Sequence, residues 1–134
     1  MVDFDIKYPL SNYKNYIECV YEFCNDGRFS MILKGSLAKG SLAKGTATKY
    51  SDIDLLILGN VKGSKVDEII TLYGNPVMTN FTENPKGILI LVYQDNISVD
   101  LDLRETISQD DLMNSRILLK YDSNFILKQL LENK

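Results

Sequence analysis

Two aspartates separated by one residue are the side chains of this sequence best suited to chemistry. Asp52 and Asp54 lie in the run SDIDLLIL at residues 51–58, whose length and branched apolar side chains predict a buried strand. Side chains alternate along a strand, so both carboxylates are expected on one face, with their Cβ atoms roughly 6 to 7 Å apart. Carboxylates at this spacing suit one hard divalent cation or a pair of them.

Mg²⁺ is the cation that this pair fits best. It takes one or two protein carboxylates, keeps some of its waters and completes its shell with the phosphate oxygens of a substrate. The alternative is that Asp52 and Asp54 are solvent-facing charges on an edge strand. The apolar residues that follow them favour a covered strand, where two unpaired carboxylates would be costly without a counter-ion. The pattern therefore predicts metal-assisted phosphoryl chemistry.

A Gly-Ser pair follows the short strand expected at residues 29–34. Gly35 lets the backbone approach a ligand closely, and Ser36 can open a helical turn whose free N–H groups attract a phosphate. Many strand-to-helix turns carry Gly-Ser for conformational reasons alone. The same five residues, GSLAK, recur immediately afterwards, so Gly40 and Ser41 compete for the phosphate role.

The loop between the two expected strands is cationic, although the chain as a whole carries a net charge of −3. Every charged residue in this loop is a lysine: Lys34, Lys39, Lys44 and Lys49. An ordinary solvated loop would explain these charges. Positive charge beside paired carboxylates is also what a nucleoside triphosphate with its bound cation requires.

The segment GSLAKGTATKYSDIDL, at residues 40–55, resembles the signature of the DNA polymerase beta-type nucleotidyltransferases. In that superfamily a Gly-Ser turn is followed by Asp-x-Asp between apolar residues. The resemblance implies that the turn holds the triphosphate, with Lys44 or Lys39 beside the leaving pyrophosphate, and that Asp52 and Asp54 hold Mg²⁺, with Mn²⁺ as the alternative. It also implies an NTP substrate, ATP in the first instance, and a third carboxylate on a neighbouring strand.

The downstream segment from residue 74 to residue 100 resembles the corresponding part of the streptomycin-type aminoglycoside adenylyltransferases. This resemblance implies that Asp100 is the third catalytic and metal-binding carboxylate. Asp100 lies in ISVDLDL at residues 97–103, which alternates as a strand does. Asp102 is two residues further on, on the same expected face, and is the alternative.

The two resemblances do not by themselves choose between the two Gly-Ser pairs. The spacing to Asp52 favours Gly40-Ser41. The family's placement of its turn directly behind an apolar strand favours Gly35-Ser36, because a strand is held in register by its neighbours, whereas extra loop residues cost little. Ser36 is the preferred candidate, and Ser41 stays open.

Composition narrows the class of protein. The chain of 134 residues suits one compact domain, here a single minimal nucleotidyltransferase domain over residues 1–134. It contains no histidine, which excludes histidine bases, His-ligated zinc and Ser-His triads. The acidic balance argues against extended nucleic acid as the substrate. No apolar run reaches membrane-spanning length and the first residues lack a signal peptide's apolar region, so a cytoplasmic protein without a membrane partner is expected.

Periodicity predicts an α/β (α+β) protein, a mixed β-sheet with helices packed on it, which corresponds to the palm-like fold of the nucleotidyltransferases. The expected helices cover residues 11–25, 65–73, 109–113 and 124–132, with Gly63-Ser64 capping the second. Further strands are expected at residues 77–81, 87–93 and 97–103, with a hairpin turn at residues 94–96 between the last two.

The implied activity is transfer of a nucleoside monophosphate, AMP from ATP in the first instance, to a hydroxyl acceptor with release of pyrophosphate. The acceptor, a small molecule or a protein, is not specified by the sequence. Two alternatives stay open: an antitoxin-type nucleotidyltransferase that modifies a HEPN-like helical toxin partner, and a non-catalytic module of the same fold that binds a nucleotide or partner. Minimal domains of this kind also form homodimers.

Overall fold

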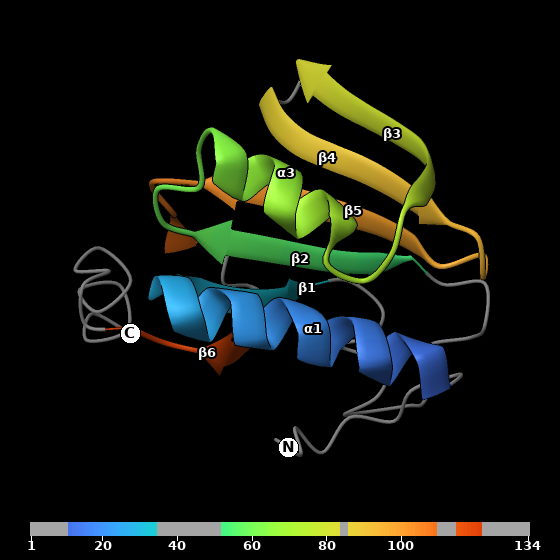
Figure 1. The fold of residues 1–134 in the computed structure, drawn as a ribbon. Coiled ribbons are helices and arrows are strands. Elements are labelled where there is room, and N and C mark those ends of the chain that lie inside the picture. Colours follow the sequence, from blue (N-terminus) through green and yellow to red (C-terminus); the bar gives the residue numbers. More distant parts are fainter. Residues whose placement is uncertain (1–10, 35–51, 84–85, 110–114, 122–134) are drawn as a thin grey trace.

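The computed structural model describes residues 11–34, 52–83, 86–109 and 115–121, which form one six-stranded sheet and two helices (Figure 1). The spatial order of the strands is β3-β4-β5-β2-β1-β6. Their bounds are, in chain order, Ser30–Lys34 for β1, Ile53–Leu58 for β2, Pro76–Glu83 for β3, Lys86–Tyr93 for β4, Ser98–Arg104 for β5 and Arg116–Leu119 for β6. β2 and β5 are parallel, and the other neighbouring pairs are antiparallel. The prediction of a mixed sheet with helices packed on it is confirmed.

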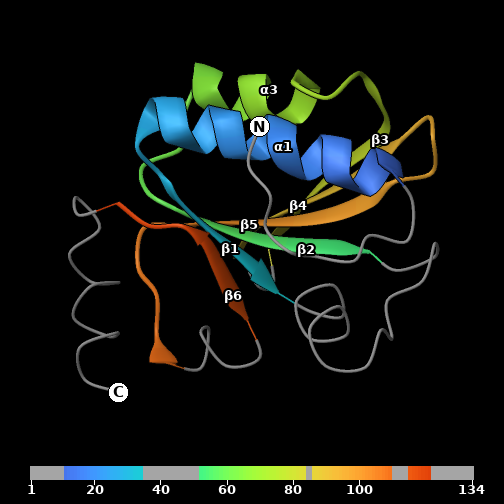
Figure 2. The same ribbon diagram turned by 90° about the horizontal axis from the view of Figure 1, so that it is seen from below.

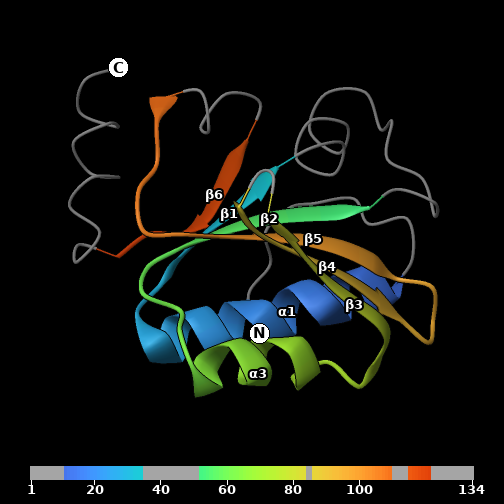
Figure 3. The ribbon, with the colours of Figure 1, turned by 90° about the horizontal axis from the view of Figure 1, so that it is seen from above.

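Both described helices cover the same face of this sheet. α1 (Ser11–Gly27) and α3 (Ser64–Thr71) lie side by side on one side of the strands, as the views from below and from above show (Figures 2 and 3). The apolar stripe of α1 that the sequence predicts is buried there against the inward side chains of the central strands, among them Leu55, Val99 and Leu101. The main core therefore lies between the helices and this face of the sheet.

The ends of α1 and β2 are fixed by one aromatic ring. Phe29 packs so closely against Gly27 and Gly59 that a Cβ added at either position would come within 2.4 Å of the ring. The Phe29 ring also stacks on Phe23 of α1, with 5.7 Å between centroids. Only glycine leaves room for the Phe29 ring at these two positions. The ring therefore contacts both the end of α1 and the residue after β2.

The opposite face of the sheet is covered only in part by the described residues. Ile32, Leu56, Leu58 and Ile107 form a second apolar cluster there, with Ile117 of β6 packed against it. The remainder of this face, over the first halves of β2 and β5, carries polar side chains. This uncovered part is where the candidate site lies.

Most of the predicted elements are present with shifted ends. α3 begins at Ser64, and its N-cap is Gly63 with φ 59° and no side-chain capping hydrogen bond, so Ser64 does not cap the helix as expected. The predicted hairpin between β4 and β5 is confirmed, and Asn96 adopts φ 68° in its turn. Strand β6 was not predicted, since its four residues give too short a pattern. The helices expected at residues 109–113, apart from Gln109, and 124–132 lie outside the described residues.

No helix among the described residues is both long enough and apolar enough to cross a membrane.

Candidate active site

Two aspartates lie directly opposite each other on the parallel pair of strands. Asp54 of β2 is the register partner of Asp100 of β5, and both side chains are half-buried. The residues on either side of Asp54, Ile53 and Leu55, belong to the core under the helices. Since side chains alternate along a strand, Asp54 and Asp100 project from the opposite face, which no described helix covers.

The register extends this pair into a row across four strands. Lys34 of β1 is the partner of Asp54, and Ile90 of β4 is the partner of Asp100. Direct cross-strand partners point to the same face of a sheet. Across the four strands, the row therefore consists of a cation, two carboxylates and an apolar side chain, in that order. A cavity of about 200 Å³ opens over this row. Its walls are Lys34, Asp54, Leu55, Ile88, Asp100 and Asp102.

The two carboxyl groups perturb each other. The pKa of Asp54 is raised to about 6, first by burial and then by the hydrogen bond to Asp100 and the negative charges of Asp100 and Asp52, whereas Lys34 acts to lower it. Two carboxylates in one small cavity cannot both ionise cheaply, and a shared proton relieves the repulsion. A bound cation would relieve it in the same way.

Asp52 lies just before the strand from which the direction of its side chain was predicted. It is exposed and precedes the first residue of β2, so the strand does not fix the direction of its side chain. Its charge acts on Asp54, and after burial it is the second cause of the raised pKa of Tyr13 in α1. Asp52 therefore lies at the end of the strand, within electrostatic reach of both the site and α1.

The described residues do not bring three carboxylates together at metal-binding distance. No group of three or more His, Cys, Asp or Glu side chains in the described ranges could hold a metal ion as placed. Asp54 and Asp100 are register partners on neighbouring strands, whereas Asp52 precedes its strand. The role of Asp52 as a metal ligand stays a prediction.

Asp102 differs from Asp100 in its surroundings. Although it faces the same cavity, its Oδ2 lies 3.3 Å from Nη1 of Arg104, two residues further along β5. This ion pair neutralises Asp102 within its own strand. Between the two aspartates of β5, Asp100 is the one with a carboxylate neighbour, and the geometry therefore favours it over Asp102.

Lys34 is a site residue that the sequence analysis did not select. It was noted among the lysines of the cationic segment, and it is the last residue of β1, as in the strand expected at residues 29–34. What the sequence did not show is its register with Asp54. The signal was present in the sequence, because Lys34 directly precedes Gly35 at the end of the apolar strand. The nucleotide-binding candidates Gly35, Ser36, Gly40, Ser41 and Lys44 lie outside the described residues.

The side chains of the row fit a divalent cation by their chemistry. Asp54 and Asp100 supply carboxylate oxygens, the ligands that Mg²⁺ prefers, from two rigid neighbouring strands. Their register and the effect of Asp100 on the pKa of Asp54 indicate that the two carboxyl groups lie close together. With two protein carboxylates, most of the cation's shell would be left to water and phosphate oxygens.

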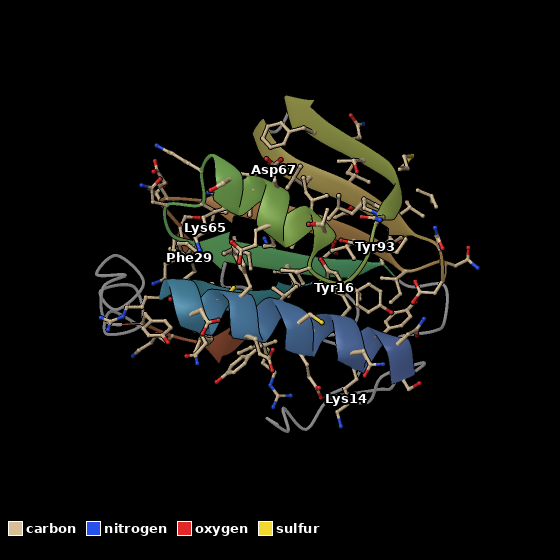
Figure 4. The ribbon with its side chains drawn as sticks, viewed as in Figure 1. Lys14, Tyr16, Phe29, Lys65, Asp67 and Tyr93 are labelled. Atoms are coloured by element: carbon tan, nitrogen blue, oxygen red, sulfur yellow. The ribbon has the colours of Figure 1, made fainter. Side chains whose placement is uncertain are left out.

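A larger cavity, of about 450 Å³, lies beside the turn between β4 and β5. Its walls include Tyr73, Tyr93 and Asp95. The Asp95 carboxylate accepts hydrogen bonds from the Tyr73 hydroxyl and from Nδ2 of Asn12, so it ties the start of α1 and the segment after α3 to the hairpin. Figure 4 shows Tyr93 and Tyr16 at this end of the molecule, on the helix side of the sheet. The cavity is therefore separate from the aspartate pair, and its carboxylate serves the fold.

A family model described as "Nucleotidyltransferase domain" matches residues 26–121 of this chain. No curated protein matches the sequence. Among solved structures, the chain is similar to one described as "The complex structure of CCA-adding enzyme with CTP", with a TM-score of 0.49 and 15% sequence identity. The similar region covers 69% of this chain and 20% of that one, so the chain spans about a fifth of the length of that protein.

Proposed function

Because the chain belongs to the nucleotidyltransferase domain family, we propose that it transfers a nucleoside monophosphate, AMP from ATP in the first instance, to a hydroxyl acceptor. The observation that supports this proposal best is the pairing of Asp54 with Asp100 on the face of the sheet that no described helix covers. In the reaction, the acceptor oxygen forms a bond to the α-phosphorus of the NTP. The bond from that phosphorus to the pyrophosphate breaks, and the acceptor's proton passes to a base.

Asp54 and Asp100 would hold Mg²⁺, with Asp52 as a further ligand if the end of the strand brings it in. A bound Mg²⁺ would neutralise the triphosphate oxygens and hold them against the acceptor. Asp100 would either complete the metal site or accept the proton of the attacking hydroxyl.

Lys34 and the apolar side chains complete the chemical environment. Lys34, next to Asp54, places a positive charge where negative charge builds up on the phosphoryl oxygens. Ile88, in the wall of the same cavity, excludes water from the side of β4. Low local polarity strengthens both effects, because charges interact more strongly away from water.

The outer phosphates are assigned to the Gly-Ser turns by the family resemblance. Gly35-Ser36 follows directly on Lys34 at the end of β1, which supports the first copy of the repeat as the phosphate-binding turn. Gly40, Ser41 and Lys44 are the second candidates. Substituting Ser36→Ala and Ser41→Ala separately, and measuring the KM for ATP, will identify the copy that is used.

The experiment that tests the proposal measures transfer of the labelled α-phosphate of ATP to an acceptor. Purified protein is incubated with ATP labelled at the α-phosphorus, Mg²⁺ and a panel of hydroxyl compounds or extract proteins, and both labelled acceptor and pyrophosphate are measured. We expect both products from the wild type and neither from Asp54→Asn or Asp100→Asn. The proposal fails if both variants transfer label as fast as the wild type.

A second candidate is a module of the same fold that binds a nucleotide without turning it over. It is favoured by one observation, that the described residues gather no group of three metal-binding carboxylates. The same experiment separates the two candidates. A binding module would bind ATP and release no pyrophosphate with any acceptor. An antitoxin-type enzyme would release pyrophosphate when a HEPN-like helical partner is added.

A further inference from the structure

Strand β3 (Pro76–Glu83) forms one edge of the described sheet. It pairs with β4 on one side and is the last strand in the spatial order β3-β4-β5-β2-β1-β6. Figure 1 shows it at the outer margin of the sheet, away from α1. An edge strand presents a row of unpaired backbone N–H and C=O groups, which is a template for pairing with another strand.

The large apolar side chains that the described part of the chain exposes all lie on this strand. They are Val77, Met78 and Phe81, with 63%, 49% and 53% of their surface exposed. Single exposed apolar residues are ordinary on a protein surface, but a group of them marks an interaction site. Here the group coincides with the free edge.

β3 carries a charge only at its last residue, Glu83, whereas charges along a strand commonly protect an edge. No charged residue occurs from Pro76 to Thr82, and proline occupies only the first position of the strand. The opposite edge of the described sheet differs in each respect, since β6 is four residues long, its side chains are half-buried and it carries Arg116. The two edges of the sheet are therefore not equivalent, and β3 is the one open to pairing.

The central part of β3 is regular. Irregularities in its register with β4 lie between Pro76 and Met78 and between Thr82 and Glu83. Residues 78–82 between them pair without interruption, from Met78 opposite Val92 to Thr82 opposite Ile88. This regular stretch of the edge is centred on Asn80.

We propose that β3 is a dimerisation edge, at which a second copy of this chain pairs its own β3 in antiparallel orientation about Asn80. A two-fold axis perpendicular to the sheet would place Asn80 opposite the partner's Asn80. Thr79 would then lie opposite the partner's Phe81 on the helix-bearing face. Met78 would lie opposite the partner's Thr82 on the face that carries the aspartate pair. The two six-stranded sheets become one continuous sheet.

An uncharged edge suits an uncharged partner edge, and a second copy of this chain supplies one. The protein has a net charge of −3, so two copies repel each other over most of their surfaces. The edge from Pro76 to Thr82 carries no charge and adds nothing to this repulsion. The polar residues of the edge are threonine and asparagine, whose side chains can hydrogen-bond to the same residues of a second copy. Threonine is also a favourable cross-strand neighbour of an aromatic residue. A charged partner strand would find no complementary charge here.

The contact would be modest in size. Stable dimers bury roughly 1,200 to 2,000 Å² in total, whereas one pair of short strands with a few exposed apolar side chains supplies less. We therefore expect a dimer that dissociates on dilution.

The first test is sedimentation velocity over a range of protein concentrations, with two double variants that use the proposed register. Thr79→Lys with Phe81→Lys places like charges opposite each other across the axis, and the protein is expected to be monomeric throughout. Thr79→Lys with Phe81→Glu places opposite charges at the same positions, and the dimer is expected to return. Both altered side chains are exposed in the wild type, and circular dichroism will verify that the two variants fold.

The second test cross-links the axis itself. Asn80→Cys in a Cys19→Ser background should form a disulfide-linked dimer under mild oxidation, because paired residues on antiparallel strands have Cα atoms about 4.5 to 5.5 Å apart, within disulfide range. Asn60→Cys, exposed on the loop after β2, is the matched control and should remain monomeric.

Three results would overturn the proposal. They are a wild type that stays monomeric at the highest concentration, a like-charge variant that still dimerises, and cross-linking no faster at position 80 than at position 60. If the opposite-charge variant fails to dimerise while the wild type does, the proposed register is wrong. Cross-linking of position 80 to a different protein alone would assign the edge to that partner instead.

Discussion

Asp54 of β2 and Asp100 of β5 lie directly opposite each other on parallel strands, and Asp100 raises the pKa of Asp54. The close approach of two acids in a half-buried cavity is unfavourable for the fold unless a proton or a cation lies between them. The arrangement therefore links protonation, cation binding, stability and the proposed activity through one pair of side chains.

Replacing either member of the pair should remove activity and stabilise the metal-free protein. Asp54→Asn and Asp100→Asn each remove one negative charge from the cavity, so transfer of labelled AMP is expected to fall at least about a hundredfold. The melting temperature without Mg²⁺ at neutral pH should rise, because the repulsion is gone. Calorimetry and the label assay on the same samples check both effects. A lower melting temperature would show that the pair stabilises the fold instead.

Asp102→Asn should have a smaller effect on activity than Asp100→Asn. Asp102 is neutralised by Arg104 at 3.3 Å, so its removal leaves the Asp54–Asp100 pair intact. We expect transfer within about tenfold of the wild type. Equal loss of activity in the two variants would contradict the assignment of Asp100 as the partner of Asp54.

The stability of the metal-free protein should depend on pH through Asp54. The pKa of Asp54 is raised from its ordinary value of 3.8 to about 6 in the folded protein, chiefly by burial. The folded state therefore holds this proton more tightly than the unfolded state. The resulting stabilisation is complete below the unfolded pKa and is lost as the pH rises through the folded pKa. Urea unfolding of the wild type and Asp54→Asn across this interval should show a difference that grows toward neutral pH and then levels off.

Mg²⁺ should stabilise the wild type and have less effect on the variants of the pair. A ligand that binds only the folded state raises its stability in proportion to the logarithm of its concentration, and a shift of a few degrees is expected at saturating Mg²⁺. Asp54→Asn should show about half of that shift or less, since one carboxylate is lost. Thermal unfolding with Mg²⁺, with Ca²⁺ and with added chelator provides the measurement. An identical Mg²⁺ shift in wild type and Asp54→Asn would place the cation elsewhere.

Lys34→Met should lower activity and move its pH profile upward. Lys34 lowers the pKa of Asp54, so removing the charge raises that pKa further and delays ionisation of the pair. Methionine keeps most of the apolar stem of the side chain, and Lys34→Arg, which keeps the charge, serves as the control. The pH profiles of kcat/KM for the three proteins distinguish an electrostatic role from a packing role, because a packing role would lower the rate without displacing the profile.

Glycine at position 59 should be required for stability. Gly59 has φ 155°, and an added Cβ would lie 2.4 Å from the Phe29 ring, so Gly59→Ala is expected to destabilise the fold by about 2 kcal/mol or more. Gly63→Ala is the matched control, because Gly63 also has positive φ, 59°, but open space around it, and it should cost only about 1 kcal/mol. Chemical denaturation compares the two variants. Similar losses would mean that backbone strain, and not the Phe29 contact, decides.

The sequence predicted the elements of this site better than their arrangement. Alternation along β5 placed Asp100 and Asp102 on one face correctly, because a strand buried on its other face has a strict period of two. The same rule does not extend to Asp52, which precedes β2 and is not held by the strand ladder. The adjacency of β2 and β5 could not be read from local patterns either, since it is decided by long-range pairing. Lys34 was overlooked for that reason, as only the β1–β2 register reveals that it lies beside Asp54.

The short strand β6 illustrates a further limit of predicting structure from local sequence patterns. Its four residues RILL contain no clear alternation, and they become a strand because β1 offers them an edge. The backbone N–H of Tyr121, just beyond β6, donates to the buried Ser30 hydroxyl at 3.1 Å, and the Tyr121 hydroxyl bonds to Asn25. Such contacts between distant parts of the chain, which hold the segment in place, have no signature in the local sequence.

The parallel pairing of β2 with β5 also has a consequence for how the candidate site is assembled. The chain leaves β2, passes through α3, β3 and β4, and only then returns beside β2, so Asp54 meets Asp100 after the entire intervening crossover is in place. Contacts of such long sequence separation form late, because the chain between them must lose the entropy of loop closure before the contact stabilises the fold. A nascent chain that ends before β5 carries Asp54 without Asp100, so the pair can form only after β5 has been synthesised.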